Sequence, residues 1–285
     1  MTMSPCDREQ VFWWSPPAPT SRWRFLRRAA QENAGDLLGP CLVDRILRER
    51  GLSIRDIQRP RLFSIGSVLH FARDGDTVWG SGINGKQPLS ELRFSHLDVR
   101  AVRGPLTAVL LRERGVHVQG DVYGDPGILT ARYWPRTPSG RAGPVYVPHM
   151  REQVGRDVRR RARVVSPLQS LEGFIDGISE ASIVYATSLH GIIIAESYGI
   201  PAVLIRNRSG ETSFKYDDYY QGTGRFGMPV FDSLEAAASY TPAVPDLRAL
   251  QQRLLAAFPF DLWAAPAPGG AAVDVRARET AGAGA

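Results

Sequence analysis

The chain of 285 residues is poor in cysteine and lysine and contains no long apolar run. Its two cysteines, Cys6 and Cys41, are too few for a disulfide framework or a cysteine-rich metal cluster. We therefore expect reduced thiols and a cytoplasmic location. The absence of a run of roughly 18 apolar residues excludes a membrane-spanning helix. The N-terminal segment has no apolar core, so a secretory signal is not expected.

Lysine accounts for only two of the 35 basic residues, Lys86 and Lys215, and the formal net charge is +6. The arginines are spread along the chain instead of being gathered in one arm. Nucleic-acid binding therefore rests on net charge alone and is not expected. A positively charged surface also suits an anionic substrate or an anionic membrane leaflet.

Short apolar runs with strand character alternate with segments that have helical spacing. This alternation is typical of α/β proteins with parallel sheets and crossover helices. The predicted strands cover residues 11–14, 62–65, 77–79, 98–102, 122–123, 145–147, 163–165, 183–186 and 202–205. The predicted helices cover residues 36–50, 104–114, 168–178, 189–198 and 245–257.

The two series of strands and helices indicate an α/β fold with two Rossmann-like lobes that face each other across a cleft. A segment rich in proline and glycine, residues 135–144, separates the two series and is the predicted linker. The expected domains are a disordered N-terminus over 1–10, an N-terminal lobe over 11–138, a C-terminal lobe over 139–263 and a disordered tail over 264–285.

Polar and glycine-rich turns follow several predicted strands, and open α/β sheets bind ligands at that edge. Arg103 follows a strand of the first lobe, and a guanidinium can grip phosphate or carboxylate with two parallel bonds. His190 lies in the first turn of a helix of the second lobe, where backbone amides favour an anion. Ser188 or Thr187 is placed to cap that helix, and Gly191 to let a ligand approach the backbone. Arg103 and His190 together form a candidate clamp for a small dianion.

Each of these residues also has a purely structural interpretation. Arg103 could pair with a carboxylate, His190 could bond to the backbone, and His149 could simply end a strand. Their joint placement at strand ends of both lobes favours a functional interpretation. Metal-protease, Cys-x-x-C, Walker and serine-elbow motifs are absent, and no metal site is predicted. The pair Asp217-Asp218 lies among aromatic residues, which favours a loop that faces a sugar or an anion.

Six motifs are more specific in combination than any one is alone. They are the segment 66–86, Val-Arg-Gly-Pro at 102–105, Tyr-Gly-Asp-Pro-Gly at 123–127, Ser-Leu-His-Gly at 188–191, Phe-Lys-Tyr-Asp-Asp-Tyr-Tyr at 214–220 and Ala-Phe-Pro-Phe-Asp-Leu-Trp at 257–263. In these motifs the chain resembles the polysaccharide pyruvyl transferases, most closely the xanthan-type ketal pyruvate transferases of exopolysaccharide assembly. The resemblance implies a two-lobed architecture similar to that of GT-B glycosyltransferases.

The resemblance also implies an activity. Such a transferase moves pyruvate from phosphoenolpyruvate to a sugar as a cyclic ketal and releases phosphate, with no cofactor. In the family, an arginine of the V-R-G turn and a histidine of the L-H-G turn hold the donor, and these match Arg103 and His190. Many members carry an arginine where this chain has Ser188, and Arg206, Arg208 or Lys215 are candidates to replace it.

The expected site has three groups of residues. Donor binding is assigned to Arg103, His190, Lys215, Ser188 and Gly191. Proton transfer is assigned to His149, Asp36 and His190, since the reaction needs an acid and a base. The cleft and the acceptor are assigned to Asn33, Gly82, Asn84, Lys86, Asp217 and Tyr219.

The xanthan-type acceptor is a terminal mannose on a lipid-linked oligosaccharide, which implies a place on the cytoplasmic face of the bacterial inner membrane. The basic and aromatic segment 22–28 offers a peripheral contact with anionic lipid, and a solvated surface helix is the alternative. Two rival functions stay open. One is a nucleotide-sugar glycosyltransferase of GT-B-like architecture, and the other is a non-catalytic carbohydrate-binding protein.

Overall fold

The computed structural model describes residues 10–14, 33–57, 61–207, 210 and 212–263. The predicted disordered ends, apart from Gln10, and the predicted lipid-binding segment 22–28 lie outside these ranges. Within them, no helix combines the length and the apolar character that crossing a membrane requires.

The first sheet contains four parallel strands in the order β1-β2-β3-β4. They are β1 (Val11–Phe12), β2 (Leu62–Phe63), β3 (Thr77–Trp79) and β4 (Asp98–Ala101). A bridge between Val102 and Tyr123 places the segment around Tyr123 beside the end of β4. The strand residues are mostly buried, as expected for a parallel sheet that is covered on both faces.

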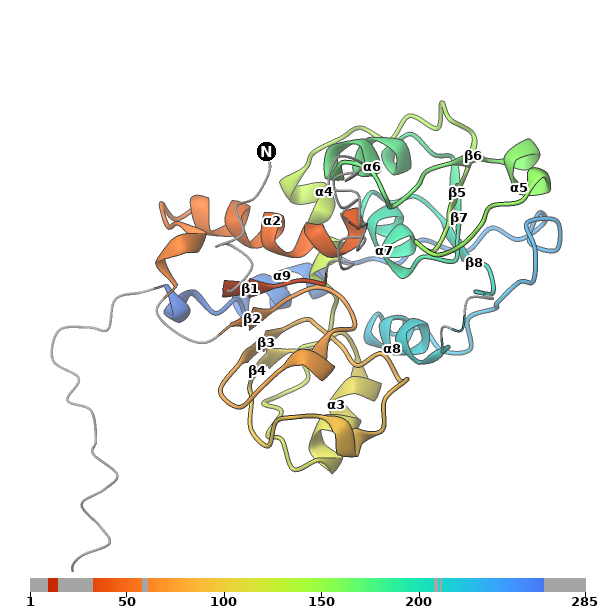
Figure 1. Cartoon of the computed structure of the whole chain (residues 1–285). Coiled ribbons are helices and arrows are strands. Elements are labelled where there is room, and N and C mark those ends of the chain that lie inside the picture. The colour runs from red at the N-terminus through yellow and green to blue at the C-terminus, as the bar shows by residue number, and fades with distance from the viewer. Residues whose placement is uncertain (1–9, 15–32, 58–60, 208–209, 211, 264–285) are drawn as a thin grey trace, which may run out of the picture.

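The second sheet also contains four parallel strands, in the order β6-β5-β7-β8. They are β5 (Pro144–Val147), β6 (Arg163–Val164), β7 (Ile183–Ala186) and β8 (Ala202–Leu204). Parallel neighbours need crossover connections, which are helical here (Figure 1). The predicted α/β class, with two parallel sheets, is confirmed.

Helices surround both sheets (Figure 1). The α-helices are α2 (Ala34–Arg48), α3 (Pro105–Glu113), α4 (Thr130–Tyr133), α5 (Arg156–Arg161), α6 (Leu171–Ser179), α7 (Leu189–Ser197), α8 (Phe214–Gly222) and α9 (Arg248–Ala256). Short 3-10 helices are η2 (Ile54–Asp56), η3 (Leu69–Phe71), η4 (Leu89–Glu91), η5 (Pro126–Leu129) and η6 (Phe260–Leu262). Side-chain caps fix where two α-helices begin, because Asn33 accepts from an amide of α2 and Ser170 from one of α6.

The largest buried core joins residues from both halves of the chain. Helix α2 packs against β1 and α6, and α7 packs against η5. The closing helix α9 returns to the first sheet, where Trp79 Nε1 donates to Leu254 O at 2.8 Å and the Trp79 ring lies 4.9 Å from that of Phe258. These contacts connect the two halves, and the predicted domain boundary near residue 138 remains a prediction.

The predicted loop over residues 214–220 is instead part of helix α8, so that prediction is wrong. The helix packs against α3, and its tyrosines at 216, 219 and 220 are buried. Gly222 makes the approach possible, because a Cβ there would lie only 2.5 Å from Arg103 O. The aromatic residues that suggested a sugar-facing loop therefore serve helix packing.

Candidate active site

The site is built around the N-terminus of α2. Asn33 Oδ1 accepts from Gly35 N at 3.1 Å, and its Nδ2 donates to Asp36 Oδ2 at 2.8 Å. One side chain thus caps the helix and orients the neighbouring carboxyl group. Asp36 is only 9% exposed, and its Oδ1 lies close to Gly66, where a Cβ would stand 3.3 Å away.

Gly35 brings the two halves of the site together. A Cβ at this position would lie 2.2 Å from His190 Nδ1, so only glycine leaves room for the imidazole. His190 belongs to the first turn of α7, in the second half of the chain. The structure therefore places His190 against Gly35 at the start of α2, the residue that precedes Asp36 in the chain.

Burial raises the pKa of Asp36 to about 7, and the negative charge of Asp125 acts in the same direction. The positive charge of Lys215 and the hydrogen bond from Asn33 oppose the rise. At neutral pH a large fraction of Asp36 is therefore protonated. A carboxyl group in this state can donate a proton, as a general acid must.

Burial also lowers the pKa of His190, to about 3, and the positive charges of Lys215, Arg103 and His149 lower it further. Part of the side chain remains exposed, but Nδ1 faces inward against Gly35. His190 is consequently neutral at physiological pH. A neutral imidazole can donate one hydrogen bond and accept another, which suits a hydrogen bond to a ligand better than an ionic clamp.

Arg103 is fully buried, and its guanidinium is held by protein groups. Nε donates to Asp218 Oδ2 at 2.9 Å, Nη1 to Ser67 Oγ at 2.5 Å, and Nη2 to Ile83 O at 2.7 Å. Gly82 lies against it, since a Cβ there would be 2.5 Å from Arg103 Cζ. In this arrangement Arg103 supplies positive charge beneath the site and positions the loops around it.

Helix α8 brings Lys215 to the same place. Asp218 Oδ1 accepts from Thr107 N at 2.9 Å, which satisfies a free amide in the first turn of α3. Tyr216 donates its hydroxyl to Thr187 O at 2.7 Å, at the end of β7. These bonds hold α8 through residues on either side of Asp217, so Lys215, which is only 9% exposed, is held where its charge acts on Asp36 and His190.

His149 and its neighbours at the ends of β5 and β7 form a second group. His149 N donates to Thr187 Oγ1 at 2.7 Å, and Thr187 donates in turn to the Glu152 carboxylate. Ser188 occupies the cap position of α7, but its side chain makes no capping hydrogen bond. The Thr187 hydroxyl donates to Glu152, so neither residue makes the predicted cap. Gly191 is needed for packing, because a Cβ there would lie 2.7 Å from Val147 Cγ1.

The residues assigned to the acceptor occupy different environments. Asn84 lies near His70, with 3.4 Å between Nδ2 and Nδ1, and its Oδ1 accepts from Lys86 N at 2.8 Å. Lys86 and Asp217 are exposed. Tyr219 is fully buried and donates to Glu196 Oε2 at 2.6 Å, so the structure does not bring it to this group.

Sequence reasoning assigned no role to Asp125 and Glu152. Asp125 is fully buried, accepts from Gly127 N at 2.9 Å, and has its pKa raised to about 6 by burial. Its one signal is its place in the Tyr-Gly-Asp-Pro-Gly motif. Glu152 carries no sequence signal, since only the fold places it beside Thr187. Throughout the ranges that the structure describes, no three His, Cys, Asp or Glu side chains are grouped so as to hold a metal ion.

Comparison with known proteins bears on what this arrangement does. No curated protein matches the chain. A family model described as polysaccharide pyruvyl transferase matches residues 48–209, which is more than half of the chain and includes Arg103, His149 and His190. The chain therefore belongs to the polysaccharide pyruvyl transferase family.

Proposed function

We propose that this transferase moves pyruvate from phosphoenolpyruvate to a sugar as a cyclic ketal and releases phosphate. The observation that carries the proposal is the group formed by Asp36, His190 and Lys215, in which a protonated carboxyl, a neutral imidazole and a buried cation converge. Phosphoenolpyruvate is an anion, which the cation binds, and its double bond must be protonated, which the carboxyl group can do. The imidazole can add a hydrogen bond to the bound donor. The GT-B-like arrangement of two lobes belongs to the same proposal.

The donor is held mainly by Lys215 and by the amides at the start of α7. A helix N-terminus favours an anion, and His190 adds a neutral hydrogen bond from the first turn of α7. Arg103 contributes its positive charge and holds Ser67 and Ile83 in place through hydrogen bonds. In this structure its guanidinium is not free to form two parallel hydrogen bonds with the donor. Of the three candidates to replace the family's arginine at Ser188, Lys215 is the one whose charge acts on both Asp36 and His190. Arg206 pairs with Asp232, and Arg208 lies outside the described residues.

Asp36 serves as the acid of the first step. It donates its proton to the methylene carbon of phosphoenolpyruvate, which makes C2 electrophilic. A sugar hydroxyl adds to C2 and gives its proton to His149, because a pKa of about 3 makes His190 a weak proton acceptor near neutral pH. Phosphate then leaves, and a neighbouring hydroxyl closes the ketal ring. Of the two hydroxyl protons, one restores the acid and the other departs with phosphate, so the reaction balances without a redox cofactor.

The acceptor in this proposal is the terminal mannose of a lipid-linked exopolysaccharide unit, as in xanthan-type enzymes. Asn33, Asn84, Lys86 and Asp217 are the polar groups assigned to it, whereas Gly82 packs against Arg103 and Tyr219 is buried against Glu196. Peripheral attachment to the cytoplasmic face of the inner membrane would bring the enzyme to such an acceptor. Its positive net charge suits an anionic leaflet.

The test is phosphate release from phosphoenolpyruvate in the presence of a mannoside. We expect release only when both substrates are present, together with a pyruvylated sugar in the product. Nucleotide sugars in place of phosphoenolpyruvate are the control. Glycosyl transfer from a nucleotide sugar, with no release from phosphoenolpyruvate, would favour the rival glycosyltransferase.

A further inference from the structure

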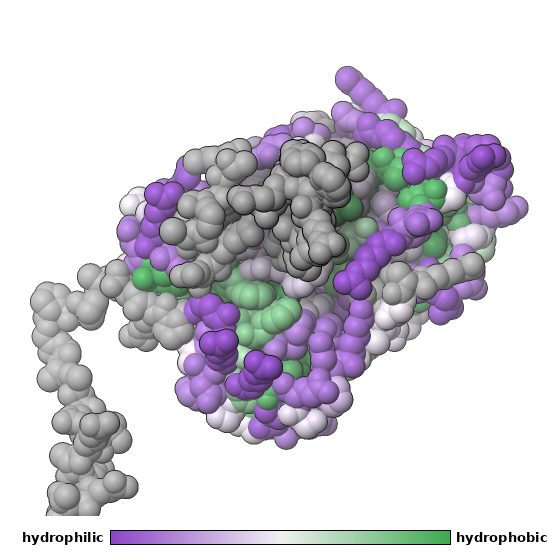
Figure 2. Space-filling view, in the orientation of Figure 1, coloured by the Kyte–Doolittle hydropathy of each residue, from purple (hydrophilic) through white to green (hydrophobic). Residues whose placement is uncertain are grey.

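A pocket of about 640 Å3 opens on the second half of the chain, outside the group formed by Asp36, His190 and Lys215. Its floor is apolar, because Tyr146, Ile205 and Leu234 are buried members of a core cluster on the face of the second sheet that points away from α7. On the side shown in Figure 2, hydrophobic residues lie among hydrophilic ones over the part of the molecule that contains β5 to β8. The pocket thus offers an apolar surface to a ligand.

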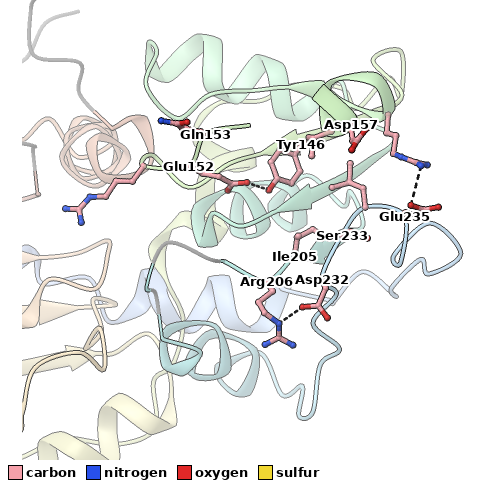
Figure 3. A pocket seen from close by; sticks show the side chains of 13 residues that line it. Tyr146, Glu152, Gln153, Asp157, Ile205, Arg206, Asp232, Ser233 and Glu235 are labelled. Atoms are coloured by element: carbon pink, nitrogen blue, oxygen red, sulfur yellow. Dashed lines mark hydrogen bonds and ion pairs between the residues drawn. The ribbon is translucent and has the colours of Figure 1, made fainter. Parts of the chain in front are cut away.

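The rim of the pocket is polar and nearly neutral. It carries four carboxylates and three guanidinium groups. Two pairs are formed among them, with 2.6 Å between Arg206 Nε and Asp232 Oδ1 and 3.5 Å between Arg161 and Glu235 (Figure 3). Because the charges balance, the rim does not favour a second anion. Planar hydrogen-bonding groups around an apolar floor suit a neutral ligand with many hydroxyls, which is the character of a sugar.

Glu152 connects this pocket to the candidate active site. It lines the pocket, where its Oε1 accepts from Tyr146 OH at 2.5 Å (Figure 3). Its Oε2 accepts from His149 N at 3.3 Å and from the Thr187 hydroxyl. Glu152 is therefore part of the pocket wall and is also hydrogen-bonded to the loop that carries His149. A chain of sugars that occupied the pocket would lead toward His149.

We propose that the pocket binds the sugars that precede the reacting terminal sugar of the acceptor oligosaccharide. The inference rests on the proposed function and extends it, because it supplies a binding site for the acceptor beyond the reacting residue. Ring C–H groups pack on Tyr146 and Ile205, and hydroxyls bond to the Arg206–Asp232 pair.

The test compares a short and a long acceptor. Methyl α-mannoside occupies only the reacting position, whereas mannotriose also reaches the pocket. In Arg206→Ala and Asp232→Ala we expect the KM for mannotriose to rise about tenfold, since a charged hydrogen bond is lost. The kcat and the KM values for methyl α-mannoside and phosphoenolpyruvate should stay as in the wild type.

Asp246→Ala is the matched control. Asp246 forms an equally short pair, 2.6 Å from Arg248, on an exposed part of the chain that does not line the pocket.

Calorimetric binding of mannotriose gives a readout that does not need turnover. Wild-type kinetics and mannotriose affinity in both rim variants would overturn the pocket assignment and leave the proposed function standing. Rim-dependent binding of mannotriose without phosphate release from phosphoenolpyruvate would overturn the proposed function and keep the pocket as a carbohydrate site. Failure of the wild type to bind mannotriose more tightly than methyl α-mannoside would also overturn the pocket assignment.

Discussion

Arg103 and Asp218 form an ion pair, with 2.9 Å between Nε and Oδ2, in which neither side chain is exposed. The same carboxylate also accepts from the Thr107 amide and hydroxyl, at 2.9 and 2.7 Å. One aspartate of α8 therefore compensates a buried arginine and completes the first turn of α3. Since Lys215 lies one turn earlier on α8, this pair also determines where the cation of the site is held.

Replacing Asp218 by alanine should strongly destabilise the protein. The change leaves the Arg103 guanidinium buried without its counter-charge, which costs roughly 3–5 kcal/mol of unfolding free energy. Denaturant unfolding of Asp218→Ala measures this loss. Asp217→Ala is the control, because Asp217 is the exposed neighbour and its removal should change stability by less than about 0.5 kcal/mol. Equal stability of the two variants would contradict the importance of the pair.

Asp36→Asn should retain the fold and lose most of the activity. The amide preserves the size of the side chain but cannot donate a proton to carbon, so kcat should fall by about 10² to 10⁴. Phosphate release measures kcat, and a thermal melt checks the fold. Asp44→Asn is the control on the same helix, because Asp44 forms only a surface pair with Arg48. A fall of less than threefold in Asp36→Asn would remove Asp36 from the role of acid.

The pH dependence of kcat/KM should have a descending limb that reports Asp36. Its pKa of about 7 lies above the ordinary value of 3.8 for this side chain, so the protonated, active form predominates below neutral pH and is lost as the pH rises through 7. Above that point kcat/KM should drop about tenfold per pH unit. His190, with a pKa of about 3, stays neutral over this range and adds no limb. The pH profile of Asp36→Asn is the control, because the ionisation of the substrates affects kcat/KM equally in the variant and in the wild type. If the descending limb persists in the variant, it belongs to a group other than Asp36.

Local patterns in the sequence predict the strands well. Strands β3 (Thr77–Trp79) and β7 (Ile183–Ala186) have the predicted bounds, because each is a short apolar run that ends at turn residues. The prediction of residues 214–220 as a loop failed for a long-range reason. Asp218 is buried because Thr107 and Arg103 need a carboxylate, and no local pattern reveals a partner 111 or 115 residues away.

The candidate site shows the same division. Residue type and position at strand ends are enough to single out Arg103 and His190, whereas Asp36 enters as a proton-transfer candidate for the reaction that the resemblance implies. The sequence does not predict that Asp36 is protonated, because this follows from its burial. Nor does it predict that the Arg103 guanidinium is bonded to Asp218, because that contact joins distant segments of the chain. Glu152 belongs to this second kind, since its link to Thr187 exists only when β5 and β7 pair.

Gly35→Ala tests whether the contact between α2 and α7 matters for activity. The added methyl group would lie 2.2 Å from His190 Nδ1, so the imidazole must move. A displacement of about 1 Å in a catalytic group can lower kcat/KM about 10²-fold, and we expect a loss of this order. Gly155→Ala is the matched control, because a Cβ at Gly155 meets no atom within 4 Å and its φ is −70°. Since alanine also favours the helix interior, Gly35→Ala should keep a folded α2 by circular dichroism while phosphate release falls. If phosphate release in Gly35→Ala equals that in Gly155→Ala, His190 does not act from the position seen here.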